Sequence, residues 1–111
     1  MNGVFADDLL VMLPSPRPGL ILHGEVLAAH KGVLAKALFE CCQDHDDHDE
    51  VTLDLTGVSY LSNGALQILV AFAQRLAPPR NLLVRSPRAL DVQERLIRRG
   101  WDITALRVLP V

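Results

Sequence analysis

The sequence predicts an α/β fold: a mixed β-sheet flanked by α-helices, in the order β-β-α-β-α-β-α-β. Short apolar runs, several of them alternating with polar residues, are typical of strands, and the segments between them carry apolar residues at helical spacing. Strands separated by helices favour a sheet with helices packed against it. The chain has 111 residues, of which 50% are hydrophobic. We therefore expect a single domain over residues 1–111 with a core of aliphatic side chains.

The first part of the chain predicts a hairpin and a helix. Residues 9–13 and 20–26 are apolar runs, and the segment between them is rich in proline and ends in glycine, which is typical of a turn. Residues 28–42 carry apolar side chains at helical spacing. The polar and strongly acidic segment 43–50 then predicts an exposed loop before the next strand.

The central strand and its helix are the most informative part of the sequence. Val51, Leu53 and Leu55 alternate with polar residues, so we expect them to be buried in a strand. Ser62 and Asn63 are both favoured N-cap residues, which predicts that a helix begins there.

The apolar side of that helix is wide. Its apolar residues spread over roughly 200°, which is more than one sheet face covers. Ile68, Val70 and Phe72 lie toward the edges of the arc, so we expect at least one of them to be partly exposed. The alternative is that the first helix covers these edge residues.

The last part of the chain predicts a strand, a helix and a closing strand. Leu82 and Val84 mark a further buried strand within residues 81–85. Ser86 followed by Pro87 predicts the N-cap and first position of a helix, and Gly100 suits its C-terminal end. Residues 101–109 then predict the closing strand.

Residues 54–66 read Asp-Leu-Thr-Gly-Val-Ser-Tyr-Leu-Ser-Asn-Gly-Ala-Leu. This run resembles the signature of the STAS domain, roughly D-L-S-G-V-x-F-[ILM]-[DS]-S-[SA]-G-L. The Gly24-Glu25-Val26 run and the Gly100-Trp101-Asp102 step are similar to other elements of that family. The resemblance covers about residues 19–109 and implies the fold of the anti-sigma-factor antagonists.

The resemblance also implies a function and a site. A chain of this kind would be a cytoplasmic protein-interaction module of bacterial signalling and transcription regulation. Its expected partner is an anti-sigma factor, a GHKL-type serine kinase or another signalling protein. The loop from Ser59 to Gly64 and the following helix would form the contact, with these partner-binding residues: Ser59, Ser62, Asn63, Gly64, Gln67 and Ile68.

The family's phosphorylated serine corresponds to Gly64, which has no hydroxyl group. We therefore expect no phosphorylation at that position. Binding would then be constitutive, or its control would lie elsewhere, with Ser62 or Ser59 as possible acceptors. The alternative function is a STAS-like module that senses a small, nucleotide-like ligand, which ligand-induced stabilisation would reveal.

The charged residues are unevenly distributed along the chain. The formal net charge is −2 at pH 7, which argues against bulk electrostatic binding to nucleic acid. Residues 1–57 hold ten of the 13 acidic residues, and residues 58–111 hold eight of the 11 basic ones. Solvated helix faces explain most of these basic residues, and a docking surface for an acidic partner is the alternative. The eight basic residues of this part of the chain are Arg75, Arg80, Arg85, Arg88, Arg95, Arg98, Arg99 and Arg107.

No pattern in the sequence predicts an enzyme or a cofactor. It contains no nucleophile elbow, no phosphate-binding loop and no Gly-x-Gly-x-x-Gly motif. His23 and His30 stand alone in the sequence, and Asp54 has no identifiable charged partner there. His45 and His48 have the spacing of a zinc or nickel chelate, but a solvated acidic loop explains them better, so we expect no metal.

The remaining patterns favour the cytoplasm. Cys41 and Cys42 are adjacent and do not suggest a disulfide framework, which agrees with a reducing compartment. No apolar run reaches the roughly 18 residues of a membrane-spanning segment. The N-terminus also lacks the basic and apolar stretches of a secretion signal, so we expect no membrane partner.

Overall fold

The computed structural model describes residues 5–15, 18–44, 49–101 and 104–111 of the chain. The strands are β1 (Phe5–Ala6), β2 (Leu10–Pro14), β3 (Gly19–Val26), β4 (Glu50–Leu61), β5 (Asn81–Ser86) and β6 (Leu106–Pro110). The α-helices are α1 (Lys31–Asp44), α2 (Asn63–Arg75) and α3 (Val92–Arg98), and two short 3₁₀ helices, η1 (Ala28–His30) and η2 (Arg88–Leu90), precede α1 and α3.

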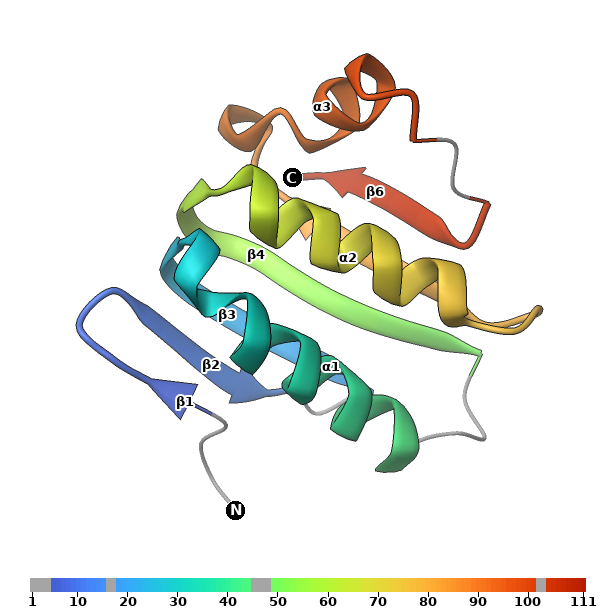
Figure 1. Cartoon of the computed structure of the whole chain (residues 1–111), viewed down its shortest axis with the longest axis horizontal. Helices are drawn as coiled ribbons and strands as arrows, with labels where there is room; N and C mark the ends of the chain where they lie inside the picture. The colour runs from blue at the N-terminus through green and yellow to red at the C-terminus, as the bar shows by residue number, and fades with distance from the viewer. Residues whose placement is uncertain (1–4, 16–17, 45–48, 102–103) are drawn as a thin grey trace.

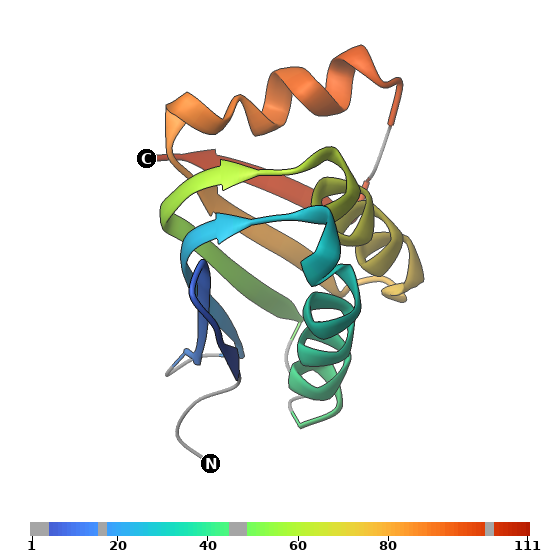
Figure 2. The same ribbon diagram turned by 60° about the vertical axis from the view of Figure 1, so that its left-hand side comes forward.

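The six strands form one mixed sheet in the order β1-β2-β3-β4-β5-β6. β1, β2 and β3 pair in antiparallel fashion, and β3 to β6 pair in parallel. The crossovers between the parallel strands are made by α1, α2 and α3. Helices α1 and α2 lie side by side over one face of the sheet, and α3 lies apart from them, next to β6 (Figures 1 and 2).

The core lies between the sheet and these helices. Val51, Leu53 and Leu55 of β4 and Leu82 and Val84 of β5 are fully buried, as the sequence predicts. The residues that alternate with them on β4 are half-buried or exposed. The mixed sheet flanked by helices is thus confirmed.

Strand β3 departs from regular pairing where it meets β2 and β4. The β3–β4 register shifts between Gly24 and Glu25. The φ angle of Gly24 is +104°, and a Cβ atom there would clash with the Leu9 carbonyl oxygen. The Glu25 amide donates to that same carbonyl at 2.8 Å. Gly24 therefore permits a close approach that other residues would obstruct.

Three details differ from the sequence predictions. The short strand β1 was not predicted, because two residues carry too little periodicity. Ser86 ends β5 instead of capping a helix: its hydroxyl donates to the Pro87 carbonyl, and η2 follows. The closing strand begins at Leu106 rather than at Trp101.

Candidate partner-binding site

The proposed partner site lies where β4 ends and α2 begins. The stretch from Ser59 to Leu61 is the end of β4, Ser62 is the N-cap, and α2 starts at Asn63, so the predicted loop is a direct strand-to-helix junction. The Ser62 hydroxyl accepts the amide of Ala65 at 3.0 Å, which confirms the predicted cap. Ser62 is only 7% exposed, so its hydroxyl is occupied and shielded.

Asn63 connects the start of α2 to α3. Its side-chain oxygen accepts a hydrogen bond of 2.8 Å from the guanidinium of Arg95. Arg95 also donates to the carbonyl of Leu90 at 3.4 Å. The sequence places Arg95 only among the basic residues of the alternative docking surface, because its contact with Asn63 joins two helices across 32 positions.

Gly64 faces the start of the first helix. A Cβ atom at this position would lie 3.1 Å from the Cδ atom of Lys31 and 3.4 Å from the Cβ atom of Ala28. The first of these contacts is tight, but it involves the flexible part of a lysine side chain. A side chain at position 64 therefore requires only a small movement of Lys31.

The other predicted residues differ in accessibility. Ser59 and Gln67 are exposed, whereas Ile68 is half-buried. Phe72 is also half-buried and Val70 is buried, so the expectation that at least one apolar residue at the edges is partly exposed is confirmed. Tyr60, which the prediction did not include, is 49% exposed. The sequence feature that could have indicated Tyr60 is an aromatic residue at an outward-facing position of the strand.

A shallow depression adjoins the junction. Its volume is about 270 Å³. It is lined by Ser59, Tyr60, Leu61, Asn63, Ala89, Leu90 and Arg95. Side chains from β4 and α2 thus meet side chains from η2 and α3 in one small polar hollow.

Arg95 brings a positive charge to this depression. Among the residues that the structure describes, no carboxylate lies within ion-pair distance of it. Burial lowers the pKa of the Arg95 guanidinium; Tyr60 and the more weakly acting Asp91 oppose this shift, and Arg99 and Arg98 add to it. An arginine stays protonated under all these influences. The depression therefore holds a permanent positive charge.

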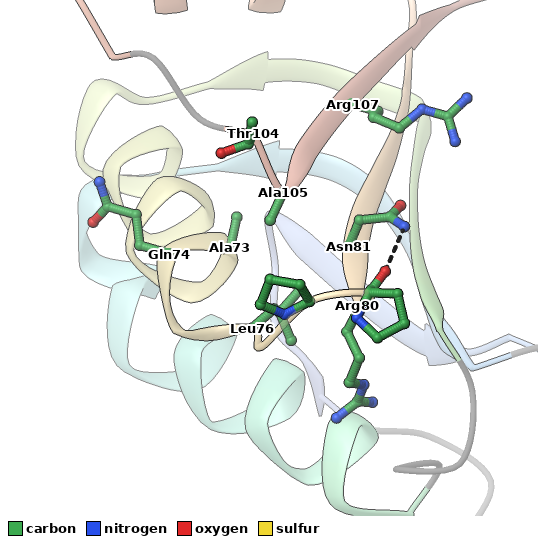
Figure 3. Close-up of a pocket in the computed structure, with 10 residues that line it drawn as sticks. Ala73, Gln74, Leu76, Arg80, Asn81, Thr104, Ala105 and Arg107 are labelled. Carbon is green, nitrogen blue, oxygen red and sulfur yellow. Dashed lines mark hydrogen bonds between the residues drawn. The ribbon is translucent and has the colours of Figure 1, made fainter.

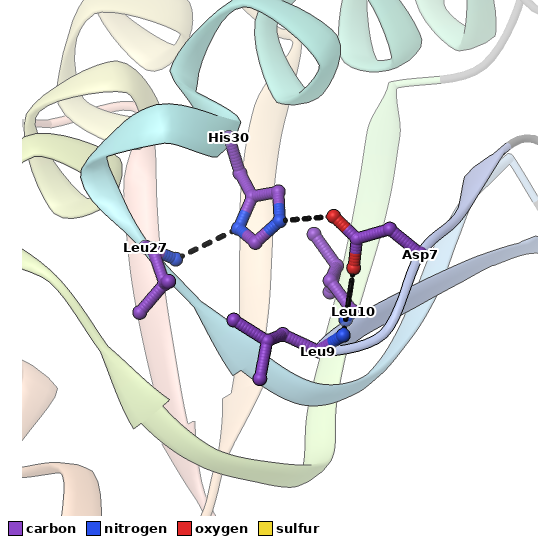
Figure 4. A network of polar contacts seen from close by, with 5 residues as sticks. All are labelled: Asp7, Leu9, Leu10, Leu27 and His30. Carbon is purple, nitrogen blue, oxygen red and sulfur yellow. Dashed lines mark hydrogen bonds and ion pairs between the residues drawn. The ribbon is translucent and has the colours of Figure 1, made fainter.

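The buried His30 and the exposed Asp7 form a polar network of a different kind (Figure 4). The Leu27 amide donates to Nδ1 of His30 at 2.9 Å, so the ring hydrogen is on Nε2, which donates to Asp7 at 2.8 Å. The other oxygen of Asp7 accepts the amides of Leu9 and Leu10, both at 2.8 Å. The Leu10 amide, His30 and the Leu9 amide together lower the pKa of Asp7 to about 2.

This network is structural. A general base needs a free ring nitrogen, and both nitrogens of His30 are already engaged. The ring of Phe5 packs edge-on against His30 with centroids 5.9 Å apart. The network therefore ties the turn between β1 and β2 to η1. No local pattern indicated it, because Asp7 and His30 are 23 positions apart.

Asp54 also has a partner that the sequence did not reveal. The register of β4 and β5 places it opposite Arg85, whose guanidinium lies 3.5 Å from its carboxylate. Burial raises the pKa of Asp54, but hydrogen bonds from Thr56 and the charge of Arg85 outweigh it, and the net direction is downward. This pair lies on the sheet face away from α1 and α2, so it takes no part in the junction.

A second hollow lies at the opposite end of α2 (Figure 3). Its volume is about 590 Å³, within the range of small-molecule sites. Apolar lining comes from Ala73, Leu76 and Ala105, and Figure 3 shows the guanidinium groups of Arg80 and Arg107 pointing away from its centre. Its lining residues are Ala73, Gln74, Leu76, Pro78, Pro79, Arg80, Asn81, Thr104, Ala105 and Arg107.

Two further observations concern metals and membranes. His45 and His48 lie outside the described residues, and within the described part no cluster of three metal-ligating side chains occurs. None of the described helices is long and apolar enough to cross a membrane.

The comparison with solved structures concerns the fold. An anti-sigma factor antagonist from Mycobacterium paratuberculosis superimposes with a TM-score of 0.75 over 96% of this chain and 90% of that chain, at 19% sequence identity. This chain has the anti-sigma-factor-antagonist fold. The sequence matches no protein-family model and no curated protein.

Proposed function

We propose that this protein is a non-enzymatic interaction module of bacterial signalling that binds an anti-sigma factor or a GHKL-type serine kinase. The observation that carries the proposal is the junction of β4 and α2, on a fold shared with an anti-sigma factor antagonist. Ser59, Asn63 and Gln67 are exposed there, and Ile68 adds a half-buried apolar group. A polar rim beside an apolar residue suits a protein interface.

Charge substitution at the junction tests the proposal. Ile68→Asp places a carboxylate on the half-buried flank of α2, and Gly64→Asp places one in its first turn, where the helix dipole favours it. Buried at an interface without a partner, that charge should weaken binding by about 2–5 kcal/mol. The matched control is Ile97→Asp, since Ile97 is a 67% exposed isoleucine on α3.

The measurement is a pull-down from the source organism, with a melting curve for each variant. We expect the two junction variants to remain folded and to lose a partner that the wild type and Ile97→Asp both retain. Folded junction variants with an unchanged partner list would place the interface elsewhere.

The absent phosphoacceptor forms a second part of the proposal. With a cognate antagonist kinase and ATP, we expect mass spectrometry to find no phosphate at Gly64. Phosphorylation of Ser62 would require α2 to release its cap, because that hydroxyl already accepts the Ala65 amide. Gly64→Ser restores a hydroxyl at the family position and should become phosphorylated. Stoichiometric phosphate on Ser62 of the wild type would refute this account.

A small-ligand sensor is the second candidate, and the hollow at the end of α2 favours it. A nucleotide-like or other compact ligand bound there would raise the melting temperature by mass action. Ala105→Leu adds bulk to the lining and should abolish the shift. A ligand that stabilises the wild type and the variant equally would exclude this hollow as its site.

A further inference from the structure

We propose that the polar depression at the β4–α2 junction receives a carboxylate side chain of the protein partner, and that Arg95 binds it. This inference rests on the proposed function, because it assigns the chemistry of the partner at the same junction. It also adds Arg95 of α3 to the interface, a residue that the predicted partner-binding set did not include.

The first argument is the unused hydrogen-bonding capacity of Arg95. A guanidinium carries about five N–H donors in a fixed fork. Arg95 donates to a side-chain amide oxygen of Asn63 and to a main-chain carbonyl of Leu90, and both of these acceptors are neutral. The remaining donors can still bind a carboxylate, and bidentate pairing makes arginine well suited to that group.

The second argument is charge complementarity. Arg98 and Arg99, the neighbours of Arg95 at the end of α3, act on its pKa in the direction expected of nearby positive charges. Asp91 and Glu94 are the acidic residues of this segment, and neither lies within ion-pair distance of Arg95. Among the described residues, the positive charge of the depression therefore has no ion-pair partner, and it would attract an acidic group.

The third argument is the position of Arg95. Asn63, to which it donates, is the first residue of α2, and the exposed side chain of Tyr60 lines the same depression. A partner that contacts Tyr60 and Asn63 would therefore lie beside Arg95. A desolvated charge pair at such a place contributes more to affinity than an exposed one at the rim.

The experiment begins with a photo-cross-linking amino acid at position 60, introduced into the full chain in cells of the source organism. Mass spectrometry identifies the partner and the cross-linked peptide, and we expect that peptide to contain Asp or Glu. A cross-link to nucleic acid instead of protein would overturn the proposal.

Affinities for the purified partner then test Arg95 itself. Arg95→Gln should weaken binding by about tenfold or more and reduce its salt dependence. The matched control is Arg75→Gln, which removes an exposed arginine from the far end of α2 and should leave the affinity within about twofold. Charge exchange, Arg95→Glu with the partner acid changed to arginine, should restore binding.

A third variant separates the docking role from a structural one. Asn63→Ala removes the bond between α2 and α3 but keeps the charge of Arg95, so the salt dependence should persist. If Asn63→Ala reproduces both the loss of affinity and the reduced salt dependence of Arg95→Gln, Arg95 only holds the helices together and the proposal is wrong. If Arg95→Gln binds as Arg75→Gln does, the proposal is also wrong. Failure of the proposed function would look different, since Ile68→Asp would then bind normally as well.

Discussion

The two ends of helix α2 differ in how their surroundings are filled. At its start, the Ser62 hydroxyl satisfies a backbone amide, Asn63 bonds to Arg95, and Leu66 is fully buried. At its end, Leu76 is 9% exposed and a hollow of about 590 Å³ remains beside it. The proposed protein-binding surface and the proposed small-ligand site would therefore lie at opposite ends of the same helix. Each can therefore be changed without touching the other.

The largest effect on stability should come from truncating buried side chains at the two ends of α2. Leu66→Ala removes a fully buried side chain from closely packed surroundings and should lower the free energy of unfolding by about 3–5 kcal/mol. Leu76→Ala only enlarges an existing opening, so we expect a smaller loss of about 2 kcal/mol. Urea denaturation measures both. Equal losses would mean that the two ends are packed equally well.

Removal of the N-cap should have the next largest effect. Ser62→Ala leaves the buried Ala65 amide without its acceptor, which should cost about 1–2 kcal/mol. The melting temperature should then fall by roughly 4–10 °C. Ser59→Ala is the control, because Ser59 is an exposed serine three positions earlier. A similar melting temperature for both variants would show that the cap contributes nothing.

Acid should weaken the contact between η1 and the turn that joins β1 and β2. The pKa of Asp7 is lowered from 3.8 to about 2, so its bonds stabilise the fold above pH 3.8 and lose that effect as the pH falls toward 2. Asp7→Asn keeps the shape without the charge and should flatten the dependence of stability on pH in that interval. Asp8→Asn, the neighbouring control, should not. Parallel pH curves for Asp7→Asn and the wild type would contradict the lowered pKa.

The smallest expected effect distinguishes two glycines in first helical turns. The Cβ atom that Gly32→Ala adds would lie in open space, so this change should stabilise the protein by about 0.5–1 kcal/mol. Gly64→Ala should gain less, because its Cβ atom must displace Lys31. The additional change Lys31→Ala should recover the difference. If the gain in stability at position 64 were as large as that at position 32, Lys31 would not hinder the new Cβ atom.

Local patterns in the sequence predicted the fold and the position of the junction between β4 and α2. Alternation located β4, and the N-cap preference of serine located the start of α2, since both depend on neighbouring residues. Arg95, the Asp54–Arg85 pair and the Asp7–His30 network depend on contacts between residues 23 to 32 positions apart. A single sequence carries no signal for such contacts. Ser86 illustrates the opposite error, because a favourable local pattern was overridden by pairing of β5 with β6.

The close approach at Gly24 has a consequence for recognising distant relatives. The proposed partner-binding residues would be free to change when a partner changes, whereas the +104° φ angle and the nearby Leu9 carbonyl do not depend on any partner. In a saturation mutagenesis library selected only for folding, we expect position 24 to stay glycine while positions 60, 63 and 67 diversify. A search pattern anchored on this backbone constraint would then detect proteins of this shape that patterns drawn from the binding surface miss.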